Sequence, residues 1–160
     1  MDVSFVSGLE HPREIAALFD EYTAMLVAGD ASFAAYLALQ RYDDELLHLE
    51  RKYGGPGGRL LLALCGGEAA GCIALHPLDA TRCELKRLYV RPAFRGRGLG
   101  RLLSERIIAD AREIGYREML LDTLPFLTEA VALYRSLGFE EIPQYNDSPM
   151  TEAIYLRLEL

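Results

Sequence analysis

Three strand-like segments joined by short turns occupy residues 59–90 and constrain the fold more than any other feature of the chain. Arg59–Cys65, Ala70–Pro77 and Cys83–Val90 are mostly apolar, and turns near Gly66 and Asp79 separate them. Strands that follow one another through turns this short pair as antiparallel hairpins. The sequence therefore predicts a sheet that is mostly antiparallel.

The apolar pattern slips by one residue inside the third of these segments. Leu85, Leu88 and Val90 are apolar, so the two-residue period of a strand fails between positions 85 and 88. One extra residue on one strand, a β-bulge, explains such a slip, and bulges favour functional edges of sheets. We therefore expect a bulge within Cys83–Val90.

Helical periodicity appears before and after the three segments. Pro12 opens a stripe of apolar residues that Gly29 and Asp30 break, and a less regular helical stretch is expected over roughly Ser32–Tyr53. Its acidic cluster, Asp43–Glu45, is expected to be a solvated face. The other expected elements are a first strand at Val3 and Phe5, a helix from Leu99 to Ile114 ended by Gly115, a strand over Glu118–Asp122, a helix over Thr128–Leu137 and a last strand over Ile154–Leu160.

The size and composition of the chain fit one domain over residues 1–160. Its 160 residues, 51% of them hydrophobic, can bury a sizeable core. The net charge of −7 argues against a protein that coats nucleic acids. The first residues do not resemble a secretory signal, and the longest purely apolar run, Leu60–Cys65, is too short to span a membrane. We expect a cytoplasmic protein with no nucleic-acid or membrane partner.

Cysteine and histidine give no sign of a metal site. Cys65, Cys72 and Cys83 lie in strand-like apolar stretches without metal-ligand spacing, and the three histidines are scattered along the chain. A free cysteine in such a stretch behaves as a small hydrophobic residue. We therefore expect core cysteines and assign no metal.

Basic residues concentrate around a glycine-rich segment. Residues 82–101 hold seven of the seventeen basic residues and one acid, a net charge of +6, which leaves −13 for the other 140 residues. Closely spaced glycines before an amphipathic helix suit a phosphate-bearing ligand, because backbone N–H groups and a helix N-terminus attract anions. Arg95–Arg101 lacks the ending of a triphosphate-binding loop and the third glycine of a dinucleotide fingerprint. A coenzyme of another kind and a simple turn stay open at this point.

Two signatures in the chain together resemble the GNAT N-acetyltransferase superfamily. Arg95-x-x-Gly98-x-Gly100, preceded by Leu85-x-x-Leu88-Tyr89-Val90-x-Pro92, is similar to the acetyl-CoA-binding motif of that family. Ala130-x-x-Leu133-Tyr134-x-x-x-Gly138-Phe139 is similar to its second signature, at the expected distance after the next strand. The two signatures occur in the family's order and span about half of the chain.

The resemblance implies both a fold and a cofactor. The fold is a mixed α/β (α+β) GNAT-like fold, with a central, mostly antiparallel sheet of six to seven strands flanked by about four helices. The cofactor is acetyl-CoA, with its pyrophosphate on backbone N–H groups and its pantetheine arm beside the strand, which splays in the family and opens a slot for the acyl group. The residues expected to bind it are Leu88, Tyr89, Val90, Arg95, Gly96, Arg97, Gly98, Leu99, Gly100 and Arg101.

The resemblance implies transfer of an acetyl group from acetyl-CoA to a primary amine of a small molecule or peptide, by direct attack without a covalent acyl-enzyme. Tyr134 would protonate the leaving thiolate, because a phenol with a pKa of about 10 is protonated at neutral pH. The alternative is a packed aromatic ring beside Leu133 and Phe139.

Glu84 is the candidate base for the same reaction. A charged amine with a pKa of about 10.4 must lose a proton before it attacks, and a carboxylate on this strand could accept it directly or through water. Alternatively, Glu84 pairs with Lys86 or Arg87, or faces solvent.

The sequence does not name the amine. The family builds its acceptor pocket from the first two helices and the late loops, here Tyr22–Tyr53 and Ile142–Met150, and neither segment contains a motif for one substrate. A non-catalytic acyl-CoA-binding or regulatory module and transfer of a longer acyl group stay as alternatives, and a homodimer stays open. Leu127 stands where many family members have asparagine, which puts one contact to the cofactor in doubt.

Overall fold

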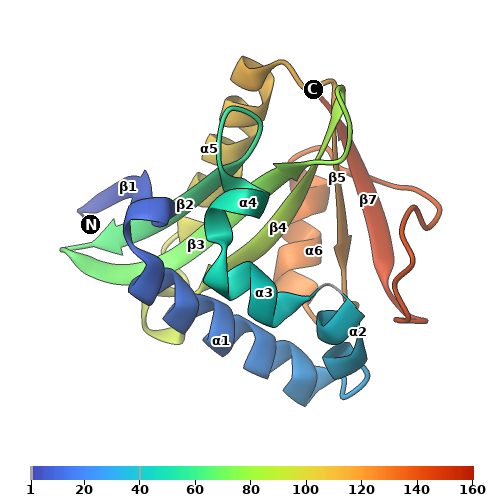
Figure 1. Ribbon diagram of the computed structural model, residues 1–160, viewed down its shortest axis with the longest axis horizontal. Coiled ribbons are helices and arrows are strands. Elements are labelled where there is room, and N and C mark those ends of the chain that lie inside the picture. The colour runs from blue at the N-terminus through green and yellow to red at the C-terminus, as the bar shows by residue number, and fades with distance from the viewer. Residues whose placement is uncertain (1, 40) are drawn as a thin grey trace.

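The computed structural model describes residues 2–39 and 41–160, which form one seven-stranded sheet with helices on both faces (Figure 1). The strand order is β1-β2-β3-β4-β5-β7-β6, and every neighbouring pair is antiparallel except β4 and β5, which run parallel. This confirms the mostly antiparallel sheet. The strands are β1 (Val3–Ser7), β2 (Arg59–Cys65), β3 (Glu68–Pro77), β4 (Arg82–Val90), β5 (Glu118–Thr123), β6 (Glu140–Glu141) and β7 (Ile154–Glu159).

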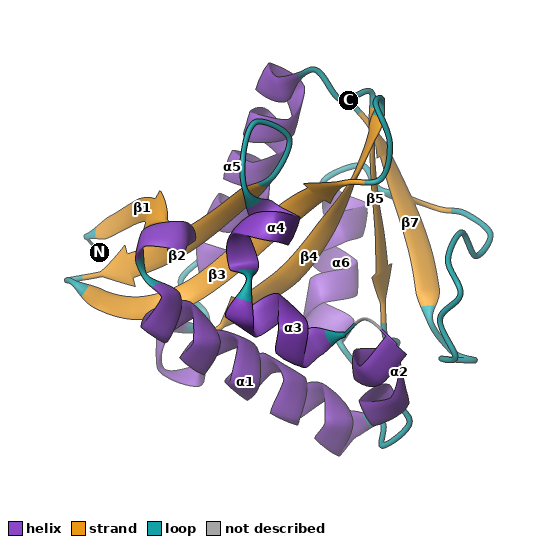
Figure 2. Ribbon diagram, in the orientation of Figure 1, coloured by secondary structure: helices purple, strands orange, loops and turns teal. Residues whose placement is uncertain are grey.

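Helices α1–α4 cover one face of the sheet, and α5 and α6 cover the other (Figure 2). Within the described residues, no helix is both long and apolar enough to cross a membrane. The expected mixed fold of sheet and flanking helices is confirmed. The helices are α1 (Pro12–Gly29), α2 (Phe33–Leu39), α3 (Tyr42–Leu47), α4 (Leu49–Tyr53), α5 (Leu99–Ile114) and α6 (Thr128–Ser136), with single 3₁₀ turns at Gly8–Glu10 and Pro92–Phe94.

The continuous helical stretch expected over Ser32–Tyr53 is wrong, because the structure divides it into α2, α3 and α4. Arg41 has a left-handed backbone with a φ of 56° directly before α3, and His48 leaves the helical region with a φ of −137°. These breaks let Phe33 of α2 pack against Leu26 and Leu124, while Tyr53 of α4 packs over β2 and β3.

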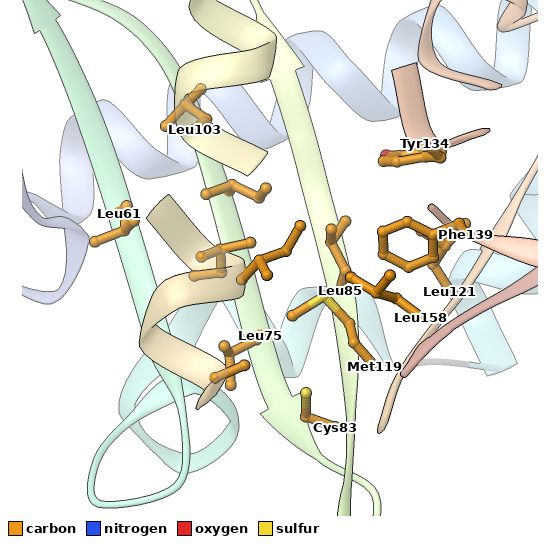
Figure 3. Close-up of a cluster of buried hydrophobic side chains, with 14 of the residues drawn as sticks. Leu61, Leu75, Cys83, Leu85, Leu103, Met119, Leu121, Tyr134, Phe139 and Leu158 are labelled. Atoms are coloured by element: carbon orange, nitrogen blue, oxygen red, sulfur yellow. The ribbon is translucent and has the colours of Figure 1, made fainter. Parts of the chain in front are cut away.

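Two apolar layers hold the sheet between its helices. The layer under α5 and α6 joins buried residues of β2–β5 and β7 to the helices (Figure 3); its members include Leu61, Leu75, Cys83, Leu85, Leu103, Ile107, Met119, Leu121, Phe139 and Leu158. The layer under α1 and α4 includes Ile15, Leu18, Phe19, Leu49, Tyr53, Leu60, Leu62 and Cys72. Both faces of β4 are therefore covered, which fixes the strand that holds most of the candidate residues.

The bulge that the sequence predicts in β4 is confirmed. Cys72 of β3 pairs with Tyr89 and Ala74 pairs with Lys86, so two steps along β3 face three steps along β4. Arg87, inside the longer stretch, has a left-handed φ of 61°. Because of the bulge, Leu85, Leu88 and Val90 all pack on the α5 side of the sheet.

β4 and β5 separate soon after they meet. Their parallel pairing runs only from Arg82↔Glu118 to Glu84↔Leu120. β4 nevertheless continues to Val90, paired with β3 on its other edge, and β5 continues to Thr123, paired with β7. The two strands thus diverge at the centre of the sheet. On its outer edge each stays paired with an antiparallel strand, β4 with β3 and β5 with β7.

Candidate active site

A cleft of about 730 Å³ lies where β4 and β5 diverge. Residues 85–90 of β4 form one wall, and residues 122–124, at the end of β5 and just beyond it, form the other. The glycine-rich segment and α6 line the cleft on one face of the sheet, and α1 and α2 line it on the opposite face. The cleft therefore passes between the strands and is reached from both faces.

The glycine-rich segment presents free backbone donors to this cleft. The N–H groups of Gly96 and Gly98 donate no hydrogen bond to a described residue, and the first intrahelical bond of α5 starts only at Leu102. The first-turn N–H groups of a helix have no acceptor within the helix. Gly96 and Gly98 have φ values of +77° and +76°, and a Cβ on either would point into open space. The segment is therefore an open row of backbone donors, the kind of arrangement that attracts anions.

The arginines around these glycines have different contacts. Arg95 binds back to β4, since its Nε donates to the Val90 carbonyl at 2.9 Å. Arg101 lines the cleft and its Nη2 donates to Ser136 Oγ at 2.6 Å. Arg97 instead stacks on Phe94, with 5.6 Å from its guanidinium carbon to the ring centroid, and does not line the cleft. The other nine residues that are expected to bind the cofactor all line the cleft.

Tyr134 lines the cleft from α6 and is only 5% exposed. Its ring makes an edge-to-face pair with Phe139, 5.6 Å between centroids, and both lie at one side of the apolar cluster in Figure 3. Burial, and then Tyr22 and Asp122, raise the pKa of Tyr134 above the ordinary value of a phenol. The hydroxyl is therefore protonated throughout the neutral range.

Glu84 does not line the same cleft as Tyr134. It is 6% exposed and lines a neighbouring cavity of about 270 Å³. Its Oε1 is 2.7 Å from His76 Nε2, and its Oε2 accepts a hydrogen bond from Tyr145. Burial alone would raise the pKa of Glu84, but Lys86 and then His76 outweigh it and lower the pKa to about 2. Glu84 is thus a buried, ionised carboxylate beside the cleft.

Glu45 corrects another expectation, because it is not part of a solvated face. Its carboxylate is buried and accepts hydrogen bonds from Arg87 Nε and Nη2, both at 3.0 Å, from Lys52 at 2.8 Å and from the Tyr53 hydroxyl at 2.9 Å. Burial would raise its pKa, but Arg87 and then Lys52 outweigh burial and lower the pKa to about 2. The ion pair fastens α3 to the bulge of β4.

A hydrogen-bonded cluster of Tyr36, Asp122 and Asn146, which the sequence did not predict, lies at the α2 side of the cleft. The Tyr36 hydroxyl donates to Asp122 Oδ2, and Asn146 Nδ2 donates to the same oxygen at 2.9 Å. Asp122 and Tyr36 both line the cleft. Only Asp122 gave a signal in the sequence, as an acid that ends a buried strand. Its partners Tyr36 and Asn146 come from distant segments that contain no motif pointing to this contact.

The cysteines Cys65, Cys72 and Cys83 are all buried in the apolar layers, which confirms that they are core residues. Within the described part of the chain, no three metal-binding side chains of the His, Cys, Asp and Glu types come together.

Comparisons with known proteins all lead to one family. The sequence profile described as the acetyltransferase (GNAT) family matches residues 16–139. An uncharacterized N-acetyltransferase of Schizosaccharomyces pombe is 40% identical over 157 residues, which cover 97% of this chain and 94% of that protein. An acetyltransferase structure from Streptococcus agalactiae has a TM-score of 0.78 at 22% identity, covering 99% of this chain and 98% of the other. A GNAT family acetyltransferase from Elizabethkingia anophelis with acetyl-CoA bound has a TM-score of 0.55 at 28% identity, covering 65% of this chain and 77% of the other.

Proposed function

Because this chain belongs to the acetyltransferase (GNAT) family, it is an acetyl-CoA-dependent N-acetyltransferase, and we propose that residues 1–160 form one domain that acetylates a primary amine of a small molecule or peptide. The single observation that carries the proposal is the cleft through the sheet, with anion-binding donors at one end and Tyr134 in its wall. The amine nitrogen bonds to the acetyl carbon as the carbon–sulfur bond breaks, so a charged amine and acetyl-CoA give the N-acetyl amine, free thiol and one proton.

The glycine-rich segment supports a site for the pyrophosphate of coenzyme A. The open faces of Gly96 and Gly98 and the first turn of α5 offer several backbone donors to one diphosphate. Leu88–Val90 line the cleft beside it, where the pantetheine arm would run along β4. The contact of Arg95 with β4 makes it a residue that holds the segment in place, and Arg101 would be the arginine of the segment that pairs with the phosphates.

Tyr134 would supply the proton that the leaving thiolate needs. Tyr134 is buried and lines the cleft, and its raised pKa keeps the hydroxyl protonated until the sulfur carries charge. The packing against Phe139 fixes the ring, so the proton is delivered from one position. A packed aromatic and a proton donor are therefore compatible roles for one residue.

Glu84 would take the proton from the incoming amine through a water molecule. Its low pKa of about 2 keeps the carboxylate ionised at neutral pH. The same low pKa makes the carboxylate a weak base, because general bases act best with a pKa near the operating pH. It lies in the cavity next to the cleft, and Lys86 and Tyr36 line both spaces. The proton thus leaves toward the α2 side, away from Tyr134.

Glu84→Gln is expected to lower kcat/KM about 10²-fold at pH 7, because an uncharged amide cannot accept the proton. The loss should shrink to a few-fold near pH 10, where much of an amine with a pKa of about 10.4 is already deprotonated. The measurement is the pH profile of kcat/KM for the variant and the wild type. Glu118→Gln removes a half-buried carboxylate from β5 outside both cavities and should follow the wild-type profile. A loss for Glu84→Gln that is constant with pH would contradict the role.

The proposed function is tested by an acceptor screen that follows thiol release from acetyl-CoA. We expect acetyl-CoA to raise the melting temperature and at least one class of primary amine to release thiol, with the N-acetyl product identified by mass spectrometry. No thermal shift at millimolar acetyl-CoA would overturn the cofactor assignment. Thiol release with the amine recovered unchanged would show hydrolysis instead of transfer.

A further inference from the structure

Lys86 is a buried cation with an incomplete set of partners. The residue is 7% exposed, and Glu84 is the only carboxylate within 4 Å of its Nζ among the described residues, with Oε1 3.8 Å away. That oxygen is already engaged by His76 at 2.7 Å. In the described part of the chain Lys86 donates no hydrogen bond at all. An ammonium group has three donors, and its burial is unfavourable unless they are satisfied.

The position of Lys86 indicates where a ligand that completes its set of partners would bind. Lys86 lines both the main cleft and the smaller cavity, and its Nζ lies 5.8 Å from the ring centroid of Tyr36, which also lines both. The side chain therefore stands at the junction of the two spaces, on the α2 face of the sheet. This is the face from which an amine reaches the cleft without crossing the glycine-rich segment.

The Asp122 carboxylate, opposite in charge to Lys86, is hydrogen-bonded to the same tyrosine, Tyr36. The Tyr36 hydroxyl and Asn146 both donate to Asp122 Oδ2, so neither of these two bonds uses Oδ1. Asp122 lines the main cleft together with the apolar side chains of Phe33 and Met150. This part of the cleft thus has a cation and an anion near Tyr36, together with apolar side chains in its lining.

Resting on the proposed acetyl transfer, we propose that the acceptor is an amine that also carries a carboxylate, as an amino acid does, with the carboxylate on Lys86 and the amino group directed to Asp122. The bound carboxylate completes the donor set of Lys86, and Phe33 and Met150 contact the apolar part of the acceptor. Polyamines and aminoglycosides carry no such anion and would offer Lys86 no carboxylate to bind. If Lys86 served only to neutralise Glu84, the enzyme would show no preference for the carboxylate.

The test compares matched acceptors, each amino acid of a panel beside its own carboxamide, which keeps the amine and the side chain. For the preferred side chain, the wild type should acetylate the free acid with a kcat/KM about tenfold to a hundredfold above that of the amide, the effect of one charged hydrogen-bonded contact. Lys86→Met keeps an apolar side chain of similar length and should reduce this ratio to about one. Lys86→Arg keeps the charge and should retain a preference.

Lys52→Met is the matched control, because Lys52 also lines the smaller cavity but is ion-paired with Glu45 at 2.8 Å. Its ratio of acid to amide should stay at the wild-type value. Binding gives an independent readout: calorimetric titration of the preferred amino acid into the wild type with coenzyme A should show an affinity about tenfold to a hundredfold above that for Lys86→Met.

The two proposals fail in different ways. If no amine of any kind releases thiol, the proposed function fails. If amides and free acids are acetylated equally by the wild type, the function stands and the assignment of Lys86 is wrong. That comparison needs no variant, so it decides the matter even if Lys86→Met does not fold.

Discussion

Replacing Tyr134 with phenylalanine is expected to lower kcat by about 10²–10⁴-fold, the usual contribution of a positioned general acid. The ring and its edge-to-face contact with Phe139 are kept, so the core under α6 stays filled. The thiolate must then leave without a proton or take one from water. Steady-state kinetics with the acceptor found in the screen measures this loss, and the thermal shift given by acetyl-CoA should be unchanged.

Tyr116→Phe is the control for the loss of a buried tyrosine hydroxyl. Tyr116 belongs to the same apolar cluster, but its hydroxyl donates to the Gly57 carbonyl at 2.7 Å and lies outside the cleft. This variant should lose about 1 kcal/mol of unfolding free energy and keep its kcat. If Tyr134→Phe turns over at the wild-type rate, Tyr134 is a packing residue and the acid must be found elsewhere.

Gly98→Glu is expected to abolish the binding of acetyl-CoA. A Cβ at this position points into the open space before α5, so the glutamate carboxylate would stand where the pyrophosphate binds and would repel it. The left-handed φ of +76° also strains any residue with a side chain. We expect no acetyl-CoA-dependent rise in melting temperature and at least a hundredfold weaker Kd by calorimetry, the effect of replacing attraction by like-charge repulsion.

Gly67→Glu, in the β2–β3 turn, is the control that separates the effect of backbone strain in Gly98→Glu from the effect of its added charge. Gly67 has a φ of +86° and open space around its missing Cβ, as Gly98 has, but it lies outside the cleft. Both variants should therefore lose a similar part of their melting temperature. Only Gly98→Glu should lose the response to acetyl-CoA. Equal responses in both variants would show that the glycine-rich segment does not hold the cofactor.

Local patterns predicted the parts of the site that depend on one segment of the chain. The break in the apolar pattern of β4 predicted the bulge, and glycine spacing before a helix predicted the backbone donors that the structure leaves open there. That these donors bind the cofactor stays a prediction. Both properties depend only on consecutive residues, because backbone conformation and the two-residue period of a strand are local. The cytoplasmic location, the homodimer and the roles of Glu84 and Tyr134 stay predictions.

Pairs brought together by the tertiary structure gave no local signal. Glu45 was expected to be solvated because it stands in an acidic run, and only the packing of α3 on β4 brings it to Arg87, 42 positions later. Asp122 meets Tyr36 and Asn146 from three separate parts of the chain. A charged residue is buried only when its partner is present, and a sequence does not say where that partner lies.

The ion pair between Glu45 and Arg87 also limits how this protein can diverge. Losing Glu45 removes the carboxylate that Arg87 binds through Nε and Nη2, and losing Arg87 leaves the buried Glu45 with Lys52 as its ion-pair partner among the described residues. Removing one member of a buried ion pair costs about 3–5 kcal/mol, a large part of the stability of a domain. Viable descendants are therefore expected to change both positions together or neither. Glu45 and Arg87 join the helices on the α2 face, where we propose that the acceptor binds, to β4, which lines the cleft. New acceptor specificities can arise most readily by substitutions inside the existing helices, and less readily by exchanging the whole helical segment for one from a relative.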